Sequence, residues 1–245
     1  MQLFEMNWPQ VKALAPQTPV VVPIAALEQH GPHMPVFTDS LLLGEVTKRV
    51  EQQLSDRVLF TPLMWLGNSE HHLDFAGTLT ASPRTYITLL KEIAGNLITH
   101  GFRRILLLNG HGGNIVPSQQ ALFELRQEHR RRDDLRLFSA TYWEAGPPPS
   151  DPSLVQTRMG HACEWETSMI LHLHPHLVGD ISRLEPITQD MPYAPAHEAW
   201  ITQDRSTPGY IGDPAAATAE KGALLLNHFS GNVVALLERV FDVAE

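Results

Sequence analysis

Two short apolar runs that end abruptly in polar residues constrain the fold of this chain most strongly. One occupies residues 20–27 and stops at Glu28, and the other occupies residues 105–108 and stops at Asn109. Apolar runs of this length, bounded by polar and turn-forming residues, predict strands that are buried within a sheet. We therefore expect a protein built around a covered sheet, with polar side chains at the ends of its strands.

Helical patterns alternate with strand patterns along the chain. Leu42, Leu43 and Val46 recur at helical spacing, and Ser82 followed by Pro83 is typical of a helix start. The expected helices cover residues 8–14, 40–54, 82–100, 118–130, 161–173 and 215–243, and the expected strands cover residues 20–24, 58–60, 105–108 and 135–142. Because strands that alternate with helices pair in parallel, this order predicts one α/β domain, residues 1–245, with helices on both faces of a mostly parallel sheet.

Two segments in the C-terminal part of the chain are less regular. Residues 175–214 are rich in proline and lack a periodic pattern, which indicates a lid or a contact between subunits. Gly222 and Gly231 lie inside the last expected helix, and they are the positions at which that helix would break.

The composition argues against several classes of partner. The chain has 245 residues, 43% of them hydrophobic, and a formal net charge of −9, which disfavours binding to nucleic acid or to an anionic membrane. Its one cysteine, Cys163, cannot form an intrachain disulfide and suits a reducing compartment. The N-terminus lacks the pattern of a secretory signal, and the apolar runs are too short to span a bilayer. We therefore expect a cytoplasmic protein.

Side chains that bind metals follow both apolar runs. Glu28 and His30 are two residues apart, so both point to the same side of an extended segment, and Asp39 follows after a short loop. His111 follows the strand expected at residues 105–108. Ligands of open α/β sheets bind at the carboxyl ends of the strands, which is where these four side chains would meet.

A third group of acidic and imidazole side chains lies near residue 161. His161 and Glu164 are three residues apart, so on the expected helix they would share a face. With the residues at the strand ends they make three carboxylates and two or three imidazoles, more than one ion needs. Two ions bridged by one carboxylate would use them all. Oxygen and nitrogen ligands without thiolates suit Zn²⁺, Mn²⁺ or Fe²⁺.

Each of these residues also has an interpretation that involves no metal. Asp39 is placed to cap the helix that follows it, and His111 is placed to serve only as part of a glycine-rich turn. Glu28 and His30 would also make a hydrogen-bonded pair inside the protein. His33 is expected to support the site rather than to bind metal.

The glycines around His111 indicate that the main chain approaches a ligand closely. Gly112 and Gly113 lack a Cβ, so a substrate can lie against their backbone. A phosphate-binding loop is the competing interpretation, but this segment has neither the lysine of such a loop nor its glycine spacing. We therefore expect Gly112 and Gly113 to contact a substrate.

These motifs, in this order, resemble those of the creatininase (creatinine amidohydrolase) family. They are Glu28-Gln29-His30-Gly31-Pro32-His33 with Thr38-Asp39, Asn68-Ser69-Glu70-His71 with Phe75-Ala76-Gly77-Thr78-Leu79, Asn109-Gly110-His111-Gly112-Gly113-Asn114, and His161-Ala162-Cys163-Glu164-Trp165-Glu166-Thr167-Ser168. The resemblance implies a three-layer α/β/α sandwich, a dinuclear metal centre and hydrolysis of a C–N bond other than a peptide bond. It also implies a homo-oligomer, commonly a hexamer.

The resemblance implies a role for each matched residue. Glu28 and His111 would bind one metal ion, His30 would bind the other, and Asp39 would bridge the two. His161 matches the catalytic histidine of the family and would pass a proton to the leaving nitrogen.

The chain departs from creatininase itself at several positions. Creatininase has a Tyr-Glu pair where this chain has Gly112 and Gly113, and we expect Glu164 to replace that glutamate as a metal ligand. The segment of residues 153–160 lacks the tryptophan with which creatininase covers its substrate, whereas Trp143 matches that enzyme's other substrate-facing tryptophan.

The remaining candidate residues have two interpretations each. Glu166 is expected to act in catalysis by orienting His161 or a metal ligand, and the equal alternative is an ordinary position in a helix. Ser69 and Trp143 are expected to line the substrate pocket, and the alternative for both is packing alone.

These features predict an amidohydrolase that uses two divalent ions, Zn²⁺, Mn²⁺ or Fe²⁺, to cleave a cyclic amide in a small-molecule substrate. Enzymes of the wider family cleave formamides or trim short peptides, so both reactions are alternatives. A metal-binding protein without activity is a second class of function. An aldolase or isomerase that uses metal ions as Lewis acids is a third.

Overall fold

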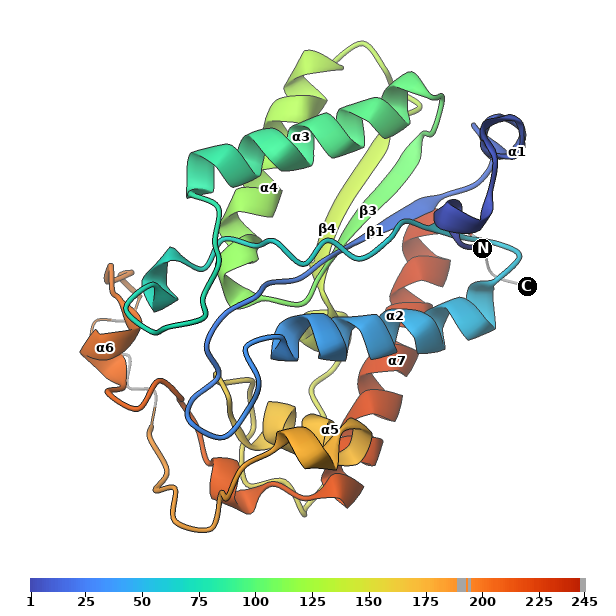
Figure 1. Ribbon diagram of the computed structural model, residues 1–245. Helices are drawn as coiled ribbons and strands as arrows, with labels where there is room; N and C mark the ends of the chain where they lie inside the picture. The colour runs from blue at the N-terminus through green and yellow to red at the C-terminus, as the bar shows by residue number, and fades with distance from the viewer. Residues whose placement is uncertain (189–192, 194, 243–245) are drawn as a thin grey trace.

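The structure is a computed structural model, and it describes residues 1–188, 193 and 195–242 (Figure 1). Its sheet contains four strands in the order β2-β1-β3-β4, and every neighbouring pair is parallel. The strands are β1 (Val20–Ile24), β2 (Leu59–Phe60), β3 (Arg104–Asn109) and β4 (Arg136–Thr141). The parallel sheet predicted from the sequence is therefore confirmed.

Helices cover both faces of this sheet. The α-helices of the described residues are α1 (Trp8–Leu14), α2 (Thr38–Leu54), α3 (Pro83–Thr99), α4 (Ile115–Glu128), α5 (Glu164–Leu173), α6 (Thr202–Arg205) and α7 (Ala219–Phe241). Helices α3 and α4 lie on one side of the strands, and α2, α5 and α7 lie on the other (Figure 1). The three-layer α/β/α sandwich implied by the family resemblance is confirmed.

The central strands are apolar because they are covered on both faces. In β1, Val20 and Val22 pack with α3 and α4, whereas Val21 packs with α2, α5 and α7. In β3, Ile105 packs on the first side and Leu106 on the second. All five side chains are buried. A strand that faces two helical layers needs an apolar residue at each position, which explains the continuous runs in the sequence.

The carboxyl ends of β1 and β3 lie at the point where the strand order reverses. From β1 the chain passes to β2 on one side and then to β3 on the other, where Ile24 of β1 pairs with Asn109 of β3. Connections that leave such a point in opposite directions open a crevice between them. The segments of residues 25–37 and 110–114 leave the two strands at this crevice, and both carry candidate site residues.

Helix α2 begins earlier than the sequence predicted, and this changes the position of Asp39. The helix starts at Thr38, and Phe37 occupies the N-cap position without a side-chain hydrogen bond to the helix. Asp39 therefore lies inside the first turn, so the interpretation of Asp39 as the cap is wrong. An acidic side chain is favourable in this turn because the helix dipole places partial positive charge there.

Helix α5 begins later than expected, at Glu164. His161 precedes the helix and pairs with Ile211 in an isolated antiparallel bridge. Ala162 has a φ of 50°, which interrupts a right-handed helix at that position. The prediction that His161 and Glu164 lie on one face of a helix is therefore wrong.

The last helix, α7, is continuous from Ala219 to Phe241, so the break considered at Gly222 or Gly231 does not occur. The last residue of the predicted helix, Val243, lies outside the described residues. Gly222 has a packing role, since a Cβ there would lie 2.0 Å from the carbonyl oxygen of Ser168 in α5. The glycine lets α5 and α7 approach closely.

The proline-rich segment of residues 175–214 is described except at residues 189–192 and 194. It contains α6, and the bridge between Ile211 and His161 ties it to the segment that leads into α5. None of the helices in the described part of the chain combines the length and the apolar character needed to cross a membrane.

Candidate metal centre

Four side chains converge where β1 and β3 end. The carboxylate of Asp39 lies between two imidazoles, with Oδ1 3.2 Å from His30 Nε2 and Oδ2 3.1 Å from His111 Nδ1. On the other side of His111, Nε2 lies 3.3 Å from Glu28 Oε2. Ser40 holds the start of α2 against this crevice by donating a hydrogen bond to the carbonyl oxygen of Ala26, 2.8 Å away. The four residues predicted from the strand ends therefore lie together.

Glu166 joins this group from the first turn of α5. Its Oε1 lies 3.7 Å from His30 Nε2, and ligand atoms of His30, Asp39 and Glu166 all lie within 4.8 Å of one another. The backbone N–H of Cys163 donates to Glu166 Oε2 over 3.4 Å, which fixes the side chain at the start of the helix. Glu166 is thus a further candidate ligand. The sequence predicted this role for Glu164, two residues earlier.

Glu164 lies outside this group. Its carboxylate accepts hydrogen bonds from Lys221 Nζ at 2.6 Å and from the backbone N–H groups of Val155 and Gln156. The physical reason is helix geometry, because residues two apart in a helix point about 200° away from each other. Once Glu166 faces the crevice, Glu164 must face the opposite side. The structure therefore does not place Glu164 where the predicted metal ligand belongs.

Several polar atoms of the cluster are buried and make no hydrogen bond to any residue that the structure describes. They are both carboxylate oxygens of Glu28, Nε2 of His30 and Oδ2 of Asp39. Buried polar atoms without hydrogen-bond partners are costly and rare in folded proteins, so their convergence indicates a missing partner. Carboxylate oxygens and imidazole nitrogens are the donors that Zn²⁺, Mn²⁺ and Fe²⁺ accept, and the cluster therefore fits divalent metal ions.

The charges of the cluster are strongly coupled. Burial acts to raise the pKa of Glu28, but His111 and His72 outweigh it and hold that pKa well below its ordinary value. Burial acts to lower the pKa of His30, but Asp39 and Glu166 raise it well above its ordinary value. In the same way Glu28 and Asp39 overcome burial and raise the pKa of His111 to about 10. The carboxylate of Glu28 thus retains its charge and requires positive charge beside it, which a bound metal ion provides in place of protons.

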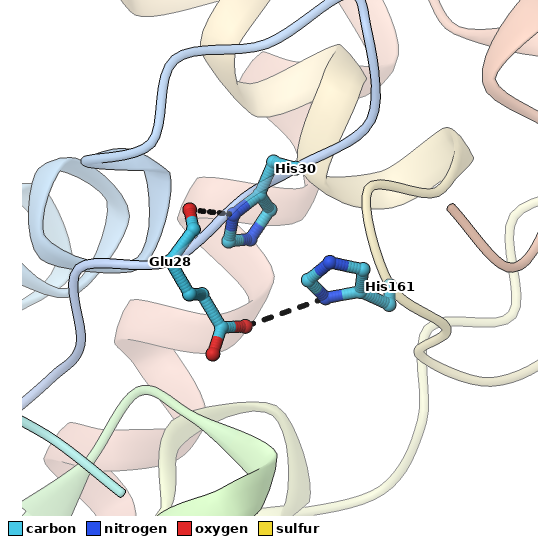
Figure 2. Close-up of side chains that lie close together, drawn as sticks. All are labelled: Glu28, His30 and His161. Carbon is cyan, nitrogen blue, oxygen red and sulfur yellow. Dashed lines mark hydrogen bonds and ion pairs between the residues drawn. The ribbon is translucent and has the colours of Figure 1, made fainter. Parts of the chain in front are cut away.

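His161 approaches the cluster from the opposite wall (Figure 2). Its Nδ1 lies 3.5 Å from Glu28 Oε1, and its Nε2 lies 2.9 Å from the carbonyl oxygen of Gln29. Nε2 also lies 3.0 Å from Gln29 Nε2, so Gln29 fixes this side of the ring and Nδ1 is the nitrogen that faces the cluster. Burial, followed by the charges of His30 and His72, lowers the pKa of His161 well below its ordinary value. The ring is therefore neutral at physiological pH.

His72 supports Glu28 from behind, although the sequence analysis gave it no role. Its Nε2 lies 3.3 Å from Glu28 Oε1, while Nδ1 contacts Gln29 Nε2 at 2.9 Å and Thr202 Oγ1 at 2.7 Å. The contacts with Gln29 and Thr202 hold the ring so that Nε2 faces Glu28. Such a partner fixes the orientation of a ligand carboxylate.

His71 was also missed as a candidate ligand. Ligand atoms of Glu28, His71 and His111 lie within 4.8 Å of one another. Burial, together with the charge of His72, lowers the pKa of His71 to about 4, so this ring is neutral at physiological pH. Two consecutive histidines in a loop were the available sequence signal.

His33 lies beside the cluster and takes no part in it. Its Nε2 lies 3.1 Å from both the carbonyl oxygen of Ala162 and Oγ1 of Thr167. The ring thereby ties the loop after β1 to the turn that carries His161, which agrees with the expected supporting role.

A cavity of about 620 Å³ opens over the cluster. Gly112, Gly113 and Trp143 line it, as expected, and Trp200 forms a further part of the wall. Ser69 instead lies beneath the cavity, where its Oγ is 3.2 Å from His111 Nε2. Trp200 belongs to the proline-rich segment of residues 175–214. That segment was expected to form a lid or a contact between subunits, but no single residue of it was predicted to reach the site.

The two glycines after His111 differ in the space around them, and this predicts different effects of substitution. A Cβ at Gly113 would lie 2.1 Å from the carbonyl oxygen of Asn68 and 2.5 Å from His111 Nε2, whereas a Cβ at Gly112 would meet no atom of the described residues within 4 Å. We expect Gly113→Ala to displace His111 and to weaken zinc binding by about 10- to 100-fold. Competition with a chromogenic chelator measures this affinity.

Gly112→Ala is the matched control and is expected to bind zinc as tightly as the unsubstituted protein. Equal affinities for the two variants would mean that the loop adapts without moving His111.

The fold and the cluster define a class of protein: an α/β sandwich with a buried carboxylate–imidazole centre at the strand ends, suited to divalent metal ions. Comparisons with known proteins make this more specific. The sequence model described as Creatininase, creatinine amidohydrolase, matches residues 4–237, and the chain belongs to the creatininase family. It is therefore a creatininase-family amidohydrolase.

Two relatives and two solved structures illustrate the similarity. The chain is 30% identical to creatinine amidohydrolase of Pseudomonas putida over 247 residues, with 91% of this chain and 90% of that protein covered. It is 31% identical to the mycofactocin precursor peptide peptidase of Mycobacterium tuberculosis over 212 residues, with 83% and 78% covered. Creatininase structures described as a manganese form and as a Zn–Zn type match with 27% identity, TM-scores of 0.82 and 0.81, and 98% of each chain covered.

Proposed function

We propose that this chain is a dinuclear metal-dependent amidohydrolase. In this proposal Glu28 and His111 would hold one divalent ion, His30 and Glu166 would hold the other, and Asp39 would be shared by the two. Glu166 replaces Glu164 in the ligand set because only Glu166 lies beside His30 and Asp39. When bound, the ions supply Lewis-acid polarisation of the amide carbonyl and lower the pKa of a water in the site.

The observation that carries this proposal is the position of Asp39. Its two oxygens face two different imidazoles, His30 at 3.2 Å and His111 at 3.1 Å, as expected of a carboxylate shared between two ions. The buried atoms of Glu28, His30 and Asp39 that lack hydrogen-bond partners support the same conclusion. The donor set accepts Zn²⁺, Mn²⁺ or Fe²⁺, and the similarity to zinc and manganese forms of creatininase favours the first two.

His161 is proposed to transfer the proton during hydrolysis. Its Nδ1 faces the cluster, and the carbonyl of Gln29 fixes the opposite side of the ring. A neutral imidazole in this position takes up a proton from the attacking water and passes it to the leaving nitrogen. Trp143 and Trp200 form apolar walls that hold the substrate and reduce its contact with water.

The cavity supports a small amide without negative charge as substrate. Its volume of about 620 Å³ suits a small molecule. The described side chains that line it include neither lysine nor arginine, and Glu198 adds negative charge to its outer wall. We therefore propose a neutral or cationic amide, with a small cyclic amide or a formamide as the first candidates.

A short peptide is the second candidate substrate. A further cavity of about 420 Å³ adjoins the first, and Met159, Gly160 and Ile211 line both. Together the two cavities have room for a substrate that is longer than a cyclic amide. The similarity to the mycofactocin precursor peptide peptidase supports this alternative.

Metal analysis combined with a hydrolysis assay tests the proposal. We expect two divalent ions per chain, and release of amine or ammonia from at least one member of a panel of cyclic amides, formamides and short peptides. Activity should disappear on dialysis against a chelator and return on addition of Zn²⁺ or Mn²⁺. Tight metal binding without turnover of any of these compounds would favour a non-catalytic protein. Carbonyl chemistry without released amine would favour an aldolase or isomerase.

A further inference from the structure

The buried carboxylate of Glu164 has a complete set of partners away from the metal cluster. Its Oε1 accepts from Lys221 Nζ at 2.6 Å and from the backbone N–H of Val155 at 3.0 Å. Its Oε2 accepts from the backbone N–H of Gln156 at 2.7 Å. Glu164 is fully buried, and Lys221 from α7 supplies the charge that such a carboxylate requires.

These contacts anchor the start of the loop formed by residues 155–160. The side chain of Gln156 strengthens the anchor, because its Oε1 accepts from the backbone N–H groups of Glu164 at 2.8 Å and of Asp213 at 2.9 Å. At the other end of the loop, the N–H of Gly160 lies 3.4 Å from Sγ of Cys163. The loop is therefore tied to α5, to α7 and to the segment after Ile211.

The same loop forms the wall between the two cavities. Met159 and Gly160 line both the cavity over the metal cluster and the adjoining cavity, while Val155 and Gln156 line only the second one. Gly160 also immediately precedes His161. A displacement of this loop changes the shape of the substrate cavity before it affects any proposed metal ligand.

We propose that Glu164, paired with Lys221, is a positioning residue for substrate binding. It holds the loop of residues 155–160 in place as the wall of the substrate cavity, and it binds no metal. This inference rests on the proposed function, because it treats the cavity over the cluster as the place where the amide binds.

The chemistry of the contact explains why the charge matters. A glutamine at position 164 has the same shape as glutamate, but its NH₂ group is a donor and would face Lys221 or the backbone N–H groups. Two donors cannot bond to each other, so at least one of these three partners loses its acceptor. A methionine at position 221 leaves the buried carboxylate without its counter-charge but keeps the backbone contacts.

The test compares Glu164→Gln and Lys221→Met with Glu166→Gln. For Glu164→Gln and Lys221→Met we expect KM to rise about tenfold while kcat changes by less than about threefold, and the metal content to remain that of the unsubstituted protein. Glu166→Gln should instead lose metal. Lys48→Met, which removes an exposed lysine from α2, is the control and should alter none of these quantities.

Limited trypsin digestion adds a measurement that requires no substrate. Arg158 is exposed and lies within the loop, so release of the anchor should speed cleavage after this residue at least about tenfold relative to Lys48→Met. The rate of trypsin cleavage can be measured even if the protein hydrolyses no amide. The digestion therefore tests whether Glu164 holds the loop in place independently of the proposed activity. If Glu164→Gln does not fold, Lys221→Met and the digestion still decide the question.

Two outcomes would overturn the inference. Loss of metal from Glu164→Gln to the extent seen with Glu166→Gln would make Glu164 a ligand. Unchanged KM and unchanged trypsin cleavage in both variants would show that the loop keeps its position without the Glu164–Lys221 pair.

Discussion

Replacing Asp39 with alanine is expected to remove both metal ions and to lower kcat/KM by more than about 10³-fold. The carboxylate faces His30 and His111 through different oxygens, so its loss affects both proposed sites at once. The loss of a residue that only supports a ligand costs about 10- to 100-fold, and a bridging ligand should cost more. Metal content by mass spectrometry and turnover of the substrate found in the panel assay measure the two effects.

Asp74→Ala is the matched control for this experiment, because Asp74 is an exposed aspartate in the loop that also carries His71 and His72. It should keep its metal and its activity. Full activity of Asp39→Ala after treatment with a chelator would refute the two-metal proposal.

Replacing His161 with alanine is expected to lower kcat by about 10²- to 10⁴-fold and to leave the metal content unchanged. The reason is that His161 faces the cluster with Nδ1, 3.5 Å from Glu28 Oε1, and it precedes α5 on a strand-like segment paired with Ile211. In the proposed ligand set it holds no ion, so the ions should remain when it is removed. Single-turnover kinetics with metal analysis of the same sample tests the prediction.

His100→Ala serves as the control because it removes an exposed histidine at the end of α3. If His161→Ala loses one ion, His161 is a ligand and the proton must be transferred by another group. His161, Glu28 and His30 do lie close enough together to hold an ion, which makes this outcome informative.

Much of the site was predictable because it depends on local patterns. The two-residue spacing of Glu28 and His30 in an extended segment places both side chains on one side, and His111 lies two residues after the end of a strand that pairs with β1. Strands that alternate with helices pair in parallel, so their carboxyl ends meet at one edge. No long-range information was needed to expect these three residues near each other.

The choice between Glu164 and Glu166 could not be made from the sequence. It depends on where α5 begins, and the pairing of His161 with Ile211, fifty residues further along the chain, delays that start. Because residues two apart in a helix point about 200° away from each other, only one of the two glutamates can face the cluster. With the helix starting at Glu164, Glu166 takes this place and Glu164 faces Lys221.

The roles of His72, Thr202 and Trp200 could not be predicted from the sequence for a similar reason. His72 contacts Glu28 on one side and Thr202 on the other, and Trp200 reaches the cavity from the same distant segment. A histidine, a threonine and a tryptophan at these positions have no distinctive spacing. Their roles follow only from a segment of irregular backbone that folds back over the strand ends.

The sequence by itself determined the α/β architecture and the residues that gather at the strand ends, because hydrophobic periodicity and short spacings act through local backbone geometry. The tertiary structure decided which glutamate of α5 joins the cluster, how His72 supports Glu28, and what forms the walls of the cavity. Those outcomes depend on contacts between segments far apart in the chain, and such contacts leave no periodic pattern in either segment.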